Sequence, residues 1–253
     1  MSSTKTALIT GGGTRIGRYF ALILAELGFN IALHYNSSKG EAEQVAEAVR
    51  RAGRVCELFH CDFLTDEAES LIARVQTKME GLSLLINSAS VYTPAKISDT
   101  SRALIEEQFA VNFIVPFLLT KCFSERVAKG CIINILDNKI TMQQSPYAAY
   151  SLSKKAFADF NKLAALELAP NIRVNAIAPG VILPASERTS DYLQWRYQGI
   201  PMQRQGELEE LGLALKYLLS NTFVTGQILF VDGGESINFE GRHSENFPTN
   251  KSI

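Results

Sequence analysis

Short runs of apolar, mostly β-branched residues alternate along the chain with longer segments whose apolar positions recur at helical spacing. The run TALIT at 6–10 is typical of the first kind, and the segment from Ile16 to Leu27 is typical of the second. The pattern predicts strands at 6–10, 31–35, 54–61, 82–87, 131–136, 172–177 and 228–231. It predicts helices at 15–29, 40–53, 66–80, 101–129, 150–169 and 207–220.

The predicted strands are continuous apolar runs rather than alternating ones, which is typical of strands that are covered on both faces. Strands and helices alternate without a linker-like break. We therefore predict an α/β protein with a single domain over 1–253, a Rossmann fold with a doubly wound seven-stranded parallel sheet and helices on both faces. The tail at 235–253 is polar and unpatterned, and we expect it to be a surface tail or an oligomer contact.

Composition excludes several classes of protein. Apolar residues make up 46% of the chain, and 25 basic residues are interspersed with 26 acidic ones, for a net charge of −1. This balance argues against nucleic acid or a membrane surface as partner. The sequence has neither the apolar stretch of a signal peptide nor an apolar run of about 18 residues, so we expect a soluble, cytoplasmic protein. The four cysteines form no CxxC pair, so we expect buried free thiols and no metal site.

A glycine-rich segment at 10–17, TGGGTRIG, joins the first predicted strand to the first predicted helix. In this context glycines permit a tight turn, and the backbone can approach a pyrophosphate at the helix N-terminus, where free amides and the helix dipole favour anions. The spacing departs from G-x-G-x-x-G, and glycines also make ordinary loops. The strand–loop–helix context favours a dinucleotide site with contacts from Gly11, Thr14, Arg15 and Ile16.

The end of the second predicted strand bears on the choice of cofactor. A site for NAD usually has Asp or Glu there to bind the ribose 2′-hydroxyl. In this chain the first acidic residue after the strand is Glu41. Neutral donors, Lys39 and Arg15 suit a 2′-phosphate better, so NADP(H) is favoured, although Ser and Lys in a loop are often simply solvated. The predicted contacts from this strand and its loop are His34, Tyr35, Asn36, Ser37 and Ser38.

Tyr150 and Lys154 are four residues apart in a predicted helix, so they lie on one face, about one turn from each other. A lysine ammonium beside a phenol stabilises the phenolate and lowers the pKa of the tyrosine. That equips the pair for proton transfer to a carbonyl or an imine. The spacing alone is common by chance, and it gains weight from further motifs in the order that such a dehydrogenase needs.

Over residues 5–235 the chain resembles the short-chain dehydrogenase/reductase family. The matching motifs are T-G-x-x-x-x-I-G at 10–17, Asp62, Asn87-Ser88-Ala89-Ser90, Asn112, Tyr150 with Lys154, Pro179-Gly180, Thr225-Gly226 and Asp232-Gly233-Gly234. The resemblance implies that the adenine is held by Asp62 and Phe63, and that the cofactor is lined by Asn87, Ser88, Ala89, Ser90, Pro179, Gly180 and Val181. It also implies that Tyr150 donates the proton, that Lys154 binds the nicotinamide ribose and that Asn112 anchors a water of a proton relay.

Asp137 departs from the usual pattern of this family, which has a serine 13 residues before the catalytic tyrosine. Aspartate suits a turn that follows a strand. However, a carboxyl at the mouth of a Rossmann cleft is costly unless it is used or paired, so we favour a functional role. The sequence leaves three roles open: a member of the proton relay, a bond to the amino-pyrimidine edge of a substrate, or control of the ionisation of Tyr150.

With an aspartate at this position, the chain resembles the pteridine reductase branch of the family, which includes dihydromonapterin reductases. Arg15 stands where the branch has an arginine at the cofactor phosphate and the pterin, and Tyr147 also matches. Ser90-Val91-Tyr92 resembles its Ser-x-aromatic segment, whose ring stacks on the pterin, although Tyr92 packed on its own domain is a fair alternative. Ser37 and Ser88 depart from the branch, which has an arginine and an asparagine there. The predicted substrate contacts are Arg15, Ser90, Tyr92, Asp137, Tyr147 and Tyr150.

The resemblance implies NADPH-dependent reduction of the C=N bond of a dihydropterin, which is a dihydromonapterin, a dihydrobiopterin or a dihydrofolate-like molecule. The alternatives are a carbonyl reductase of the 3-oxoacyl–acyl carrier protein type and a non-catalytic NADP(H)-binding sensor. Family resemblance also predicts a homotetramer and a substrate lid at about 183–206. In that lid Tyr192, Trp195 and Tyr197 either close over a flat substrate or pack on the body of the protein.

Overall fold

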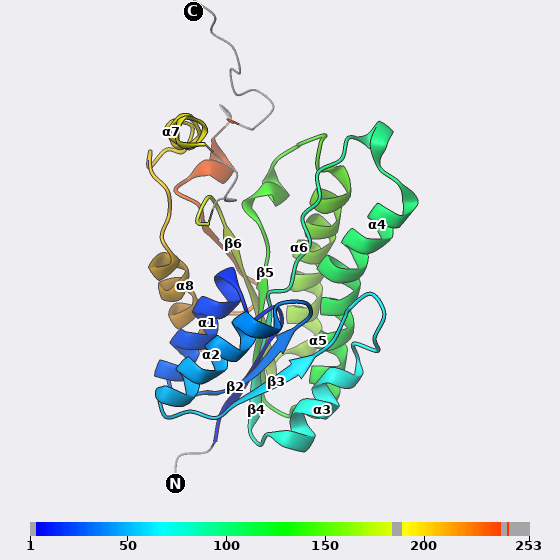
Figure 1. The fold of residues 1–253 in the computed structure, drawn as a ribbon, viewed down its shortest axis with the longest axis vertical. Helices are drawn as coiled ribbons and strands as arrows, with labels where there is room; N and C mark the ends of the chain where they lie inside the picture. The colour runs from blue at the N-terminus through cyan, green and yellow to red at the C-terminus, as the bar shows by residue number, and fades with distance from the viewer. Residues whose placement is uncertain (1–3, 184–188, 239–241, 243–253) are drawn as a thin grey trace, which may run out of the picture.

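The computed structural model describes residues 4–183, 189–238 and 242 (Figure 1). In these residues seven strands, paired in parallel, form one sheet in the order β3-β2-β1-β4-β5-β6-β7. The strands are β1 (Thr6–Ile9), β2 (Asn30–Tyr35), β3 (Cys56–His60), β4 (Leu82–Asn87), β5 (Gly130–Ile135), β6 (Ile172–Pro179) and β7 (Ile228–Val231). The α-helices are α1 (Arg15–Glu26), α2 (Lys39–Arg51), α3 (Ser70–Lys78), α4 (Arg102–Phe109), α5 (Val115–Arg126), α6 (Ala148–Leu168), α7 (Ser190–Gln198) and α8 (Leu208–Ser220). The predicted fold is confirmed.

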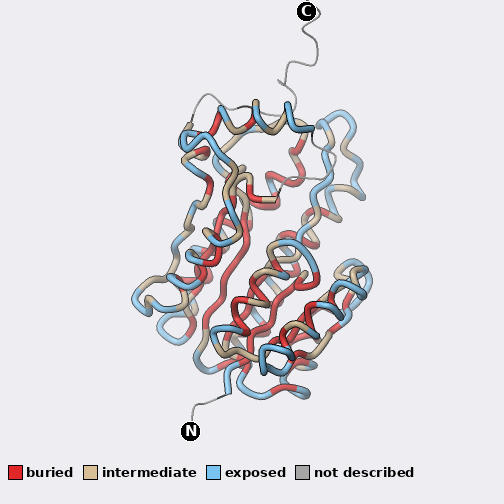
Figure 2. The backbone as a smooth tube through the Cα atoms, turned by 60° about the vertical axis from the view of Figure 1, so that its left-hand side comes forward, coloured by how far each residue is buried: buried red, intermediate tan, exposed pale blue. Residues whose placement is uncertain are grey.

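Neighbouring residues of each strand enter opposite cores, because the side chains of a strand alternate between its two faces. In β1, Ile9 packs in the core under α1, α2 and α8, whereas Leu8 packs in the core under α3, α5 and α6, and both are fully buried. Figure 2 shows buried residues along the strands and on the sides of the helices that face them. Burial on both faces explains why the strands are continuous apolar runs.

The long helix predicted at 101–129 consists of α4, a π-helical turn η2 (Ala110–Ile114) and α5. Pro116, at the start of α5, has no N–H to donate to the carbonyl of residue 112, four positions earlier. The α-helical hydrogen-bond ladder is therefore interrupted at this point, and the wider turn contains the fully buried Asn112. The apolar pattern of the sequence hardly changes over one such turn, so it predicted a single helix.

Helix α7 was not predicted, because its apolar residues do not form one stripe. Its sequence does contain a start signal, since Thr189 precedes it and accepts a hydrogen bond from the backbone N–H of Tyr192 at 3.3 Å. Helix α3 begins later than predicted. Asp62 and Asp66 first close a turn, in which the N–H of Asp66 donates to the carbonyl of Asp62 at 2.8 Å.

The stretch Arg102–Arg126, which spans α4 to α5, is long and apolar enough by length and composition to cross a membrane, since an 18-residue window of it has a mean hydropathy of 1.4. The core helices of globular proteins meet the same criteria. In this protein α5 packs against β4 and α6, and it contributes Leu119 and Phe123 to the core beneath it. The packing is that of a helix within an α/β domain.

Candidate active site

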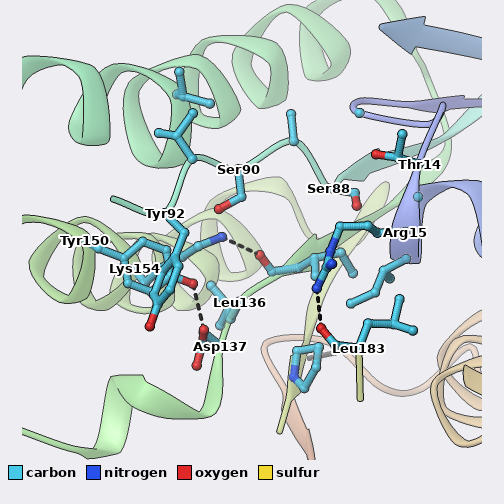
Figure 3. Close-up of a pocket in the computed structure, with 18 of the residues that line it drawn as sticks. Thr14, Arg15, Ser88, Ser90, Tyr92, Leu136, Asp137, Tyr150, Lys154 and Leu183 are labelled. Atoms are coloured by element: carbon cyan, nitrogen blue, oxygen red, sulfur yellow. Dashed lines mark hydrogen bonds between the residues drawn. The ribbon is translucent and has the colours of Figure 1, made fainter. Parts of the chain in front are cut away.

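A cavity of about 790 Å³ opens at the carboxyl ends of the strands. It lies where the sheet order reverses, since β1 is flanked by β2 on one side and by β4 on the other. Ligands of open α/β sheets bind at such a switch point. Figure 3 shows side chains from the glycine loop, from the loop after β4 and from α6 converging on this space.

Most of the residues predicted for the cofactor and the substrate line this cavity. From the glycine loop and β2 to β3 these are Gly11, Thr14, Arg15, Ile16, His34, Asn36, Ser37, Ser38, Asp62 and Phe63. From the remainder of the chain they are Ser88, Ala89, Ser90, Tyr92, Asp137, Tyr147, Tyr150, Lys154, Pro179, Gly180 and Val181. Sequence analysis missed several lining residues, among them Leu136, Asn138, Lys139, Gln144, Leu183, Leu193 and Arg196.

Three predicted residues do not line the cavity. The ring of Tyr35 packs edge-on against His60, with 5.5 Å between ring centroids. Asn87 is buried and donates from Nδ2 to Oδ1 of Asn134 on β5 at 3.0 Å. Both side chains contact residues of neighbouring strands at the carboxyl ends of the sheet, and neither lines the cavity.

Asn112 is the third, and its side chain holds the loop after β4. Its Oδ1 accepts from the hydroxyl of Ser90 at 2.9 Å and from the N–H of Val91 at 3.0 Å, and its Nδ2 donates to the carbonyl of Val91 at 3.0 Å. Nδ2 also contacts Ser153 and Gln108. The amide side chain is thus engaged by protein partners, and it positions Ser90 at the cavity wall.

The glycine loop leaves the start of α1 open. Thr14 precedes the helix but makes no side-chain cap, so the first amides of α1 have no side-chain acceptor from this residue. Gly11 has a φ of +62°, and a Cβ on Gly17 would lie 2.3 Å from the carbonyl oxygen of Gly11. Glycine at both positions lets the loop fold tightly against the helix, as a pyrophosphate site at a helix N-terminus requires.

Replacing Gly17 with alanine is expected to weaken NADPH binding by at least about tenfold, because the loop backbone must shift to relieve the contact with Gly11. The measurement is titration of the nicotinamide fluorescence. Gly40→Ala is the matched control, since a Cβ at Gly40 meets nothing within 4 Å and helix α2 tolerates alanine. Equal affinity of the two variants would contradict this role of the loop.

The loop after β2 shows a second open helix start. Ser38 precedes α2, but its side chain makes no cap hydrogen bond with the first amides of the helix. Asn36 and Ser37 line the cavity beside it. Uncapped helix amides with neutral donors suit a phosphate. Phe63 forms the neighbouring wall, stacked on His34 with 4.2 Å between centroids.

The imidazole of His34 binds the backbone of the glycine loop. Its Nδ1 accepts a hydrogen bond from the N–H of Gly11 at 3.1 Å, so Nε2 carries the proton and donates to the carbonyl of Cys61 at 2.9 Å. Burial lowers the pKa of His34 from 6.5 to about 4. The neutral imidazole is therefore part of the cofactor loop, although its own atoms are almost entirely buried.

Acidification is expected to destabilise the protein through His34. Because the folded-state pKa lies below the ordinary value, the unfolded chain binds more protons between pH 6.5 and 4, and the stabilisation present above pH 6.5 is lost across that window. The loss amounts to as much as about 3 kcal/mol in the free energy of unfolding. Urea denaturation of wild type and His34→Asn at both ends of the window measures it. A wild-type slope no steeper than that of His34→Asn would contradict the prediction, and His60→Asn, at an exposed site, is the control.

Asp137, at the end of β5, binds two partners with its two carboxylate oxygens. Oδ1 accepts from the N–H of Lys139 at 2.9 Å and caps the turn η3 (Asn138–Thr141), while Oδ2 accepts from the hydroxyl of Tyr150 at 2.7 Å (Figure 3). Asp137 therefore caps a turn, as aspartate often does after a strand, and it also contacts the predicted proton donor.

The expected lowering of the pKa of Tyr150 is wrong for this arrangement. Burial raises the pKa well above its ordinary value, and the Asp137 carboxylate raises it further. Lys154 does not offset these effects, because its Nζ donates to the carbonyl of Ile135 at 3.0 Å and burial lowers its own pKa to about 8. Tyr150 is therefore held as a protonated phenol that donates to Asp137.

An aromatic wall closes the substrate side of the cavity. Tyr92 stacks on Tyr147 with 4.8 Å between centroids and meets Tyr150 edge-on at 4.6 Å. Nζ of Lys139 lies 4.4 Å from the centroid of Tyr92 and 4.6 Å from that of Tyr147, and it bonds to the hydroxyl of Tyr92. Tyr92, Tyr147 and Lys139 line the cavity beside Tyr150, and an aromatic lining with a cation suits a flat heterocycle.

The predicted lid segment contributes less than expected. Tyr192 lines the cavity, but Trp195 and Tyr197 do not. Trp195 lies beside Arg242 of the C-terminal tail, and the hydroxyl of Tyr197 donates to Gln205 of the same segment at 2.6 Å. Residues 184–188 of this segment lie outside the described part of the chain.

Comparison with known proteins agrees with this geometry. Residues 13–236 match a family model described as enoyl-(acyl carrier protein) reductase. An uncharacterized oxidoreductase of Mycobacterium tuberculosis is 33% identical, with 91% of both chains covered. A dihydromonapterin reductase of Enterobacter sp. is 32% identical (92% of this chain, 98% of the relative), and a 3-oxoacyl-[acyl-carrier-protein] reductase of Staphylococcus aureus is 30% identical (92% and 99%).

A solved structure is also similar over nearly the whole chain. It is FolM alternative dihydrofolate reductase 1 from Brucella suis in complex with NADP, with a TM-score of 0.89, 30% identity, and coverage of 97% of this chain and 99% of that one. The fold, the cavity at the switch point and these matches lead to one assignment. The chain belongs to the short-chain dehydrogenase/reductase family of oxidoreductases.

Proposed function

We propose that the protein is an NADPH-dependent reductase of a dihydropterin, which adds a hydride and a proton across a ring C=N bond to give the tetrahydro form. The observation that carries the proposal is the hydrogen bond from Tyr150 to Asp137 at 2.7 Å, beside the aromatic wall of Tyr92 and Tyr147. Support also comes from relatives named dihydromonapterin reductase and alternative dihydrofolate reductase.

A carboxylate in this position favours C=N reduction over ketone reduction. When a ketone accepts a hydride, negative charge develops on its oxygen, and a neighbouring carboxylate would repel that charge. A ring nitrogen of a dihydropterin gains a proton instead, and the amino and N–H groups of its pyrimidine edge are donors that match an acceptor such as Asp137. The chemistry of the substrate therefore fits the residue that departs from the usual family pattern.

The residues of this chain would bind and orient the pterin and protonate its ring nitrogen. A reduced nicotinamide bound in the cavity would supply the hydride. The stack of Tyr92 and Tyr147 would give the pterin a flat surface, and Tyr150 would donate its proton to the ring nitrogen. Asp137 holds that hydroxyl in place, and Lys154 reaches the strand β5 beneath it.

NADPH rather than NADH is supported by the open phosphate site after β2. Ser38 leaves the start of α2 uncapped, Asn36 and Ser37 line the cavity, and the first acid after the strand is Glu41. The similar structure from Brucella suis holds NADP. An at least tenfold lower Kd for NADPH than for NADH is the corresponding expectation.

The test is oxidation of NADPH by the purified protein with dihydromonapterin, dihydrobiopterin and dihydrofolate, with acetoacetyl-CoA as the comparison substrate. Turnover of a pterin without turnover of the acyl ketone supports the proposal. Turnover of the acyl ketone alone would overturn it in favour of a 3-oxoacyl–acyl carrier protein reductase, the activity named for one relative. Cofactor binding without turnover of any of the four would indicate a sensor.

We also propose that the protein assembles as a homotetramer through the outer face of α6. Leu152, Leu163 and Leu166 recur on this face and are 57%, 64% and 80% exposed, with the exposed Asp159 among them, so three apolar side chains are uncovered in one chain. Light scattering should give about four times 27.9 kDa for the wild type, and Leu163→Arg should reduce the mass. Val55→Arg, at another exposed apolar site, is the control. A monomeric wild type would contradict the proposal.

A further inference from the structure

The far end of the cavity is lined by a cation of helix α7. Arg196 lines the cavity, yet only 6% of its surface is exposed. One nitrogen of its guanidinium, Nη2, binds the carboxylate of Glu235, the first residue of the turn η4 (Glu235–Ile237). The second terminal nitrogen of the guanidinium, Nη1, is buried and has no hydrogen-bond partner among the described residues. A buried donor without an acceptor is costly, and an acceptor atom of a bound molecule would remove that cost.

A series of contacts connects this arginine to the reacting groups. Glu235 also accepts from Nδ2 of Asn138 at 2.9 Å, and Asn138 lies between Asp137 and Lys139 in the chain. Burial lowers the pKa of Lys139, the charge of Asp137 raises it, and the charge of Arg196 lowers it again, so the groups lie close enough to interact. One end of the cavity thus runs from Tyr150 and Asp137 past Lys139 to Arg196.

Donors exceed acceptors along this end. Both carboxylate oxygens of Asp137 already accept hydrogen bonds, and so do both oxygens of Glu235, from Arg196 and Asn138. The ammonium of Lys139 has three N–H groups, and the guanidinium of Arg196 has five. Beside Lys139 and Arg196, a bound molecule therefore gains most from acceptor atoms, whereas the remaining lone pairs of Asp137 can still accept from donors of the pterin ring.

We propose that Arg196 is a specificity-determining residue that donates from Nη1 to an acceptor oxygen on the substrate's side chain, with Lys139 as a second donor on the way. The inference rests on the proposed function: the pterin ring lies at Tyr150 and Asp137, and its side chain extends toward α7. Hydroxyl groups of a polyol side chain and carboxylates of a folate-type side chain share this chemistry. A side chain without oxygen gains nothing from Arg196.

The test compares three substrates in wild type and Arg196→Lys, a variant that keeps the positive charge beside Glu235 but removes the fork. The substrates are dihydromonapterin, dihydrofolate and a dihydropterin whose side chain is a methyl group. We expect kcat/KM to fall about tenfold for an oxygen-bearing substrate and to stay within about twofold for the methyl compound. Loss with dihydromonapterin alone assigns hydroxyl recognition, and loss with dihydrofolate alone assigns carboxylate recognition.

Two controls keep the result interpretable. Arg204→Lys makes the same change at an arginine that is half exposed and does not line the cavity, and it should alter none of the three values. Trp195, the only tryptophan of the chain, adjoins Arg196, so its fluorescence reports binding of the same compounds independently of turnover. If the variant changes all three substrates equally, or none, the inference is overturned while the proposed function stands. If wild type reduces none of the pterins, the proposed function fails first.

Discussion

Asp137→Asn is expected to lower kcat for dihydropterin reduction on the order of 10²-fold, while the Kd for NADPH stays within about twofold. Asparagine can still accept from the N–H of Lys139 through Oδ1, so the turn η3 is kept. What is lost is the negative charge of the carboxylate, which accepts the hydrogen bond of the Tyr150 hydroxyl and suits the donor edge of a pterin. Steady-state oxidation of NADPH with a saturating pterin measures the effect.

The same variant has a spectroscopic signature. Because the Asp137 charge raises the pKa of Tyr150, the tyrosinate absorbance of Tyr150 should appear at lower pH in Asp137→Asn than in wild type. Subtracting the titration of a Tyr150→Phe counterpart isolates this residue from the other seven of the eight tyrosines. A variant that loses NADPH binding along with activity would show that Asp137 is structural. Gain of ketone reduction in Asp137→Ser, which has the serine usual in the family, would show that the aspartate selects the substrate.

Tyr150→Phe is expected to lower kcat on the order of 10³-fold, because the hydroxyl is the only tyrosine oxygen held by Asp137 in the described residues. Phenylalanine keeps the ring and its edge-on contact with Tyr92, so the aromatic wall and the cofactor site should persist. Single-turnover measurements with premixed NADPH separate the proton-transfer step from product release.

The matched control for this substitution is Tyr197→Phe. The hydroxyl of Tyr197 donates to Gln205 and does not line the cavity, so its loss should leave turnover nearly unchanged. Retention of more than about a tenth of wild-type kcat in Tyr150→Phe would mean that the proton reaches the substrate by another path.

The order of elements was predictable because it depends on periodicity over many residues. Continuous apolar strands between helical segments allow few arrangements other than a parallel sheet covered on both faces, and the described fold has this form. Segments whose local pattern is ambiguous were predicted less well. The π-helical turn around Asn112 follows from one missing N–H at Pro116, and α7 lacks a single apolar stripe.

Motif residues of the site were predictable because their spacing places them at the carboxyl ends of the strands. The roles of individual atoms were not. Sequence put Lys154 one turn from Tyr150 and so predicted a lowered tyrosine pKa, but Asp137 contacts the hydroxyl directly and burial acts in the same direction. Arg196 was missed because its place at the cavity depends on Glu235, 39 residues later in the chain.

Arg15 belongs to two parts of the protein at once. Its backbone adopts a φ of +49°, in the left-handed region, at the start of α1, and its guanidinium binds the carbonyl of Leu183, where the predicted lid segment begins (Figure 3). The glycine loop and the first residue of the predicted lid segment therefore share one side chain. If a bound dinucleotide and a bound substrate both act on this contact, thermodynamic reciprocity requires that each changes the affinity for the other by the same factor.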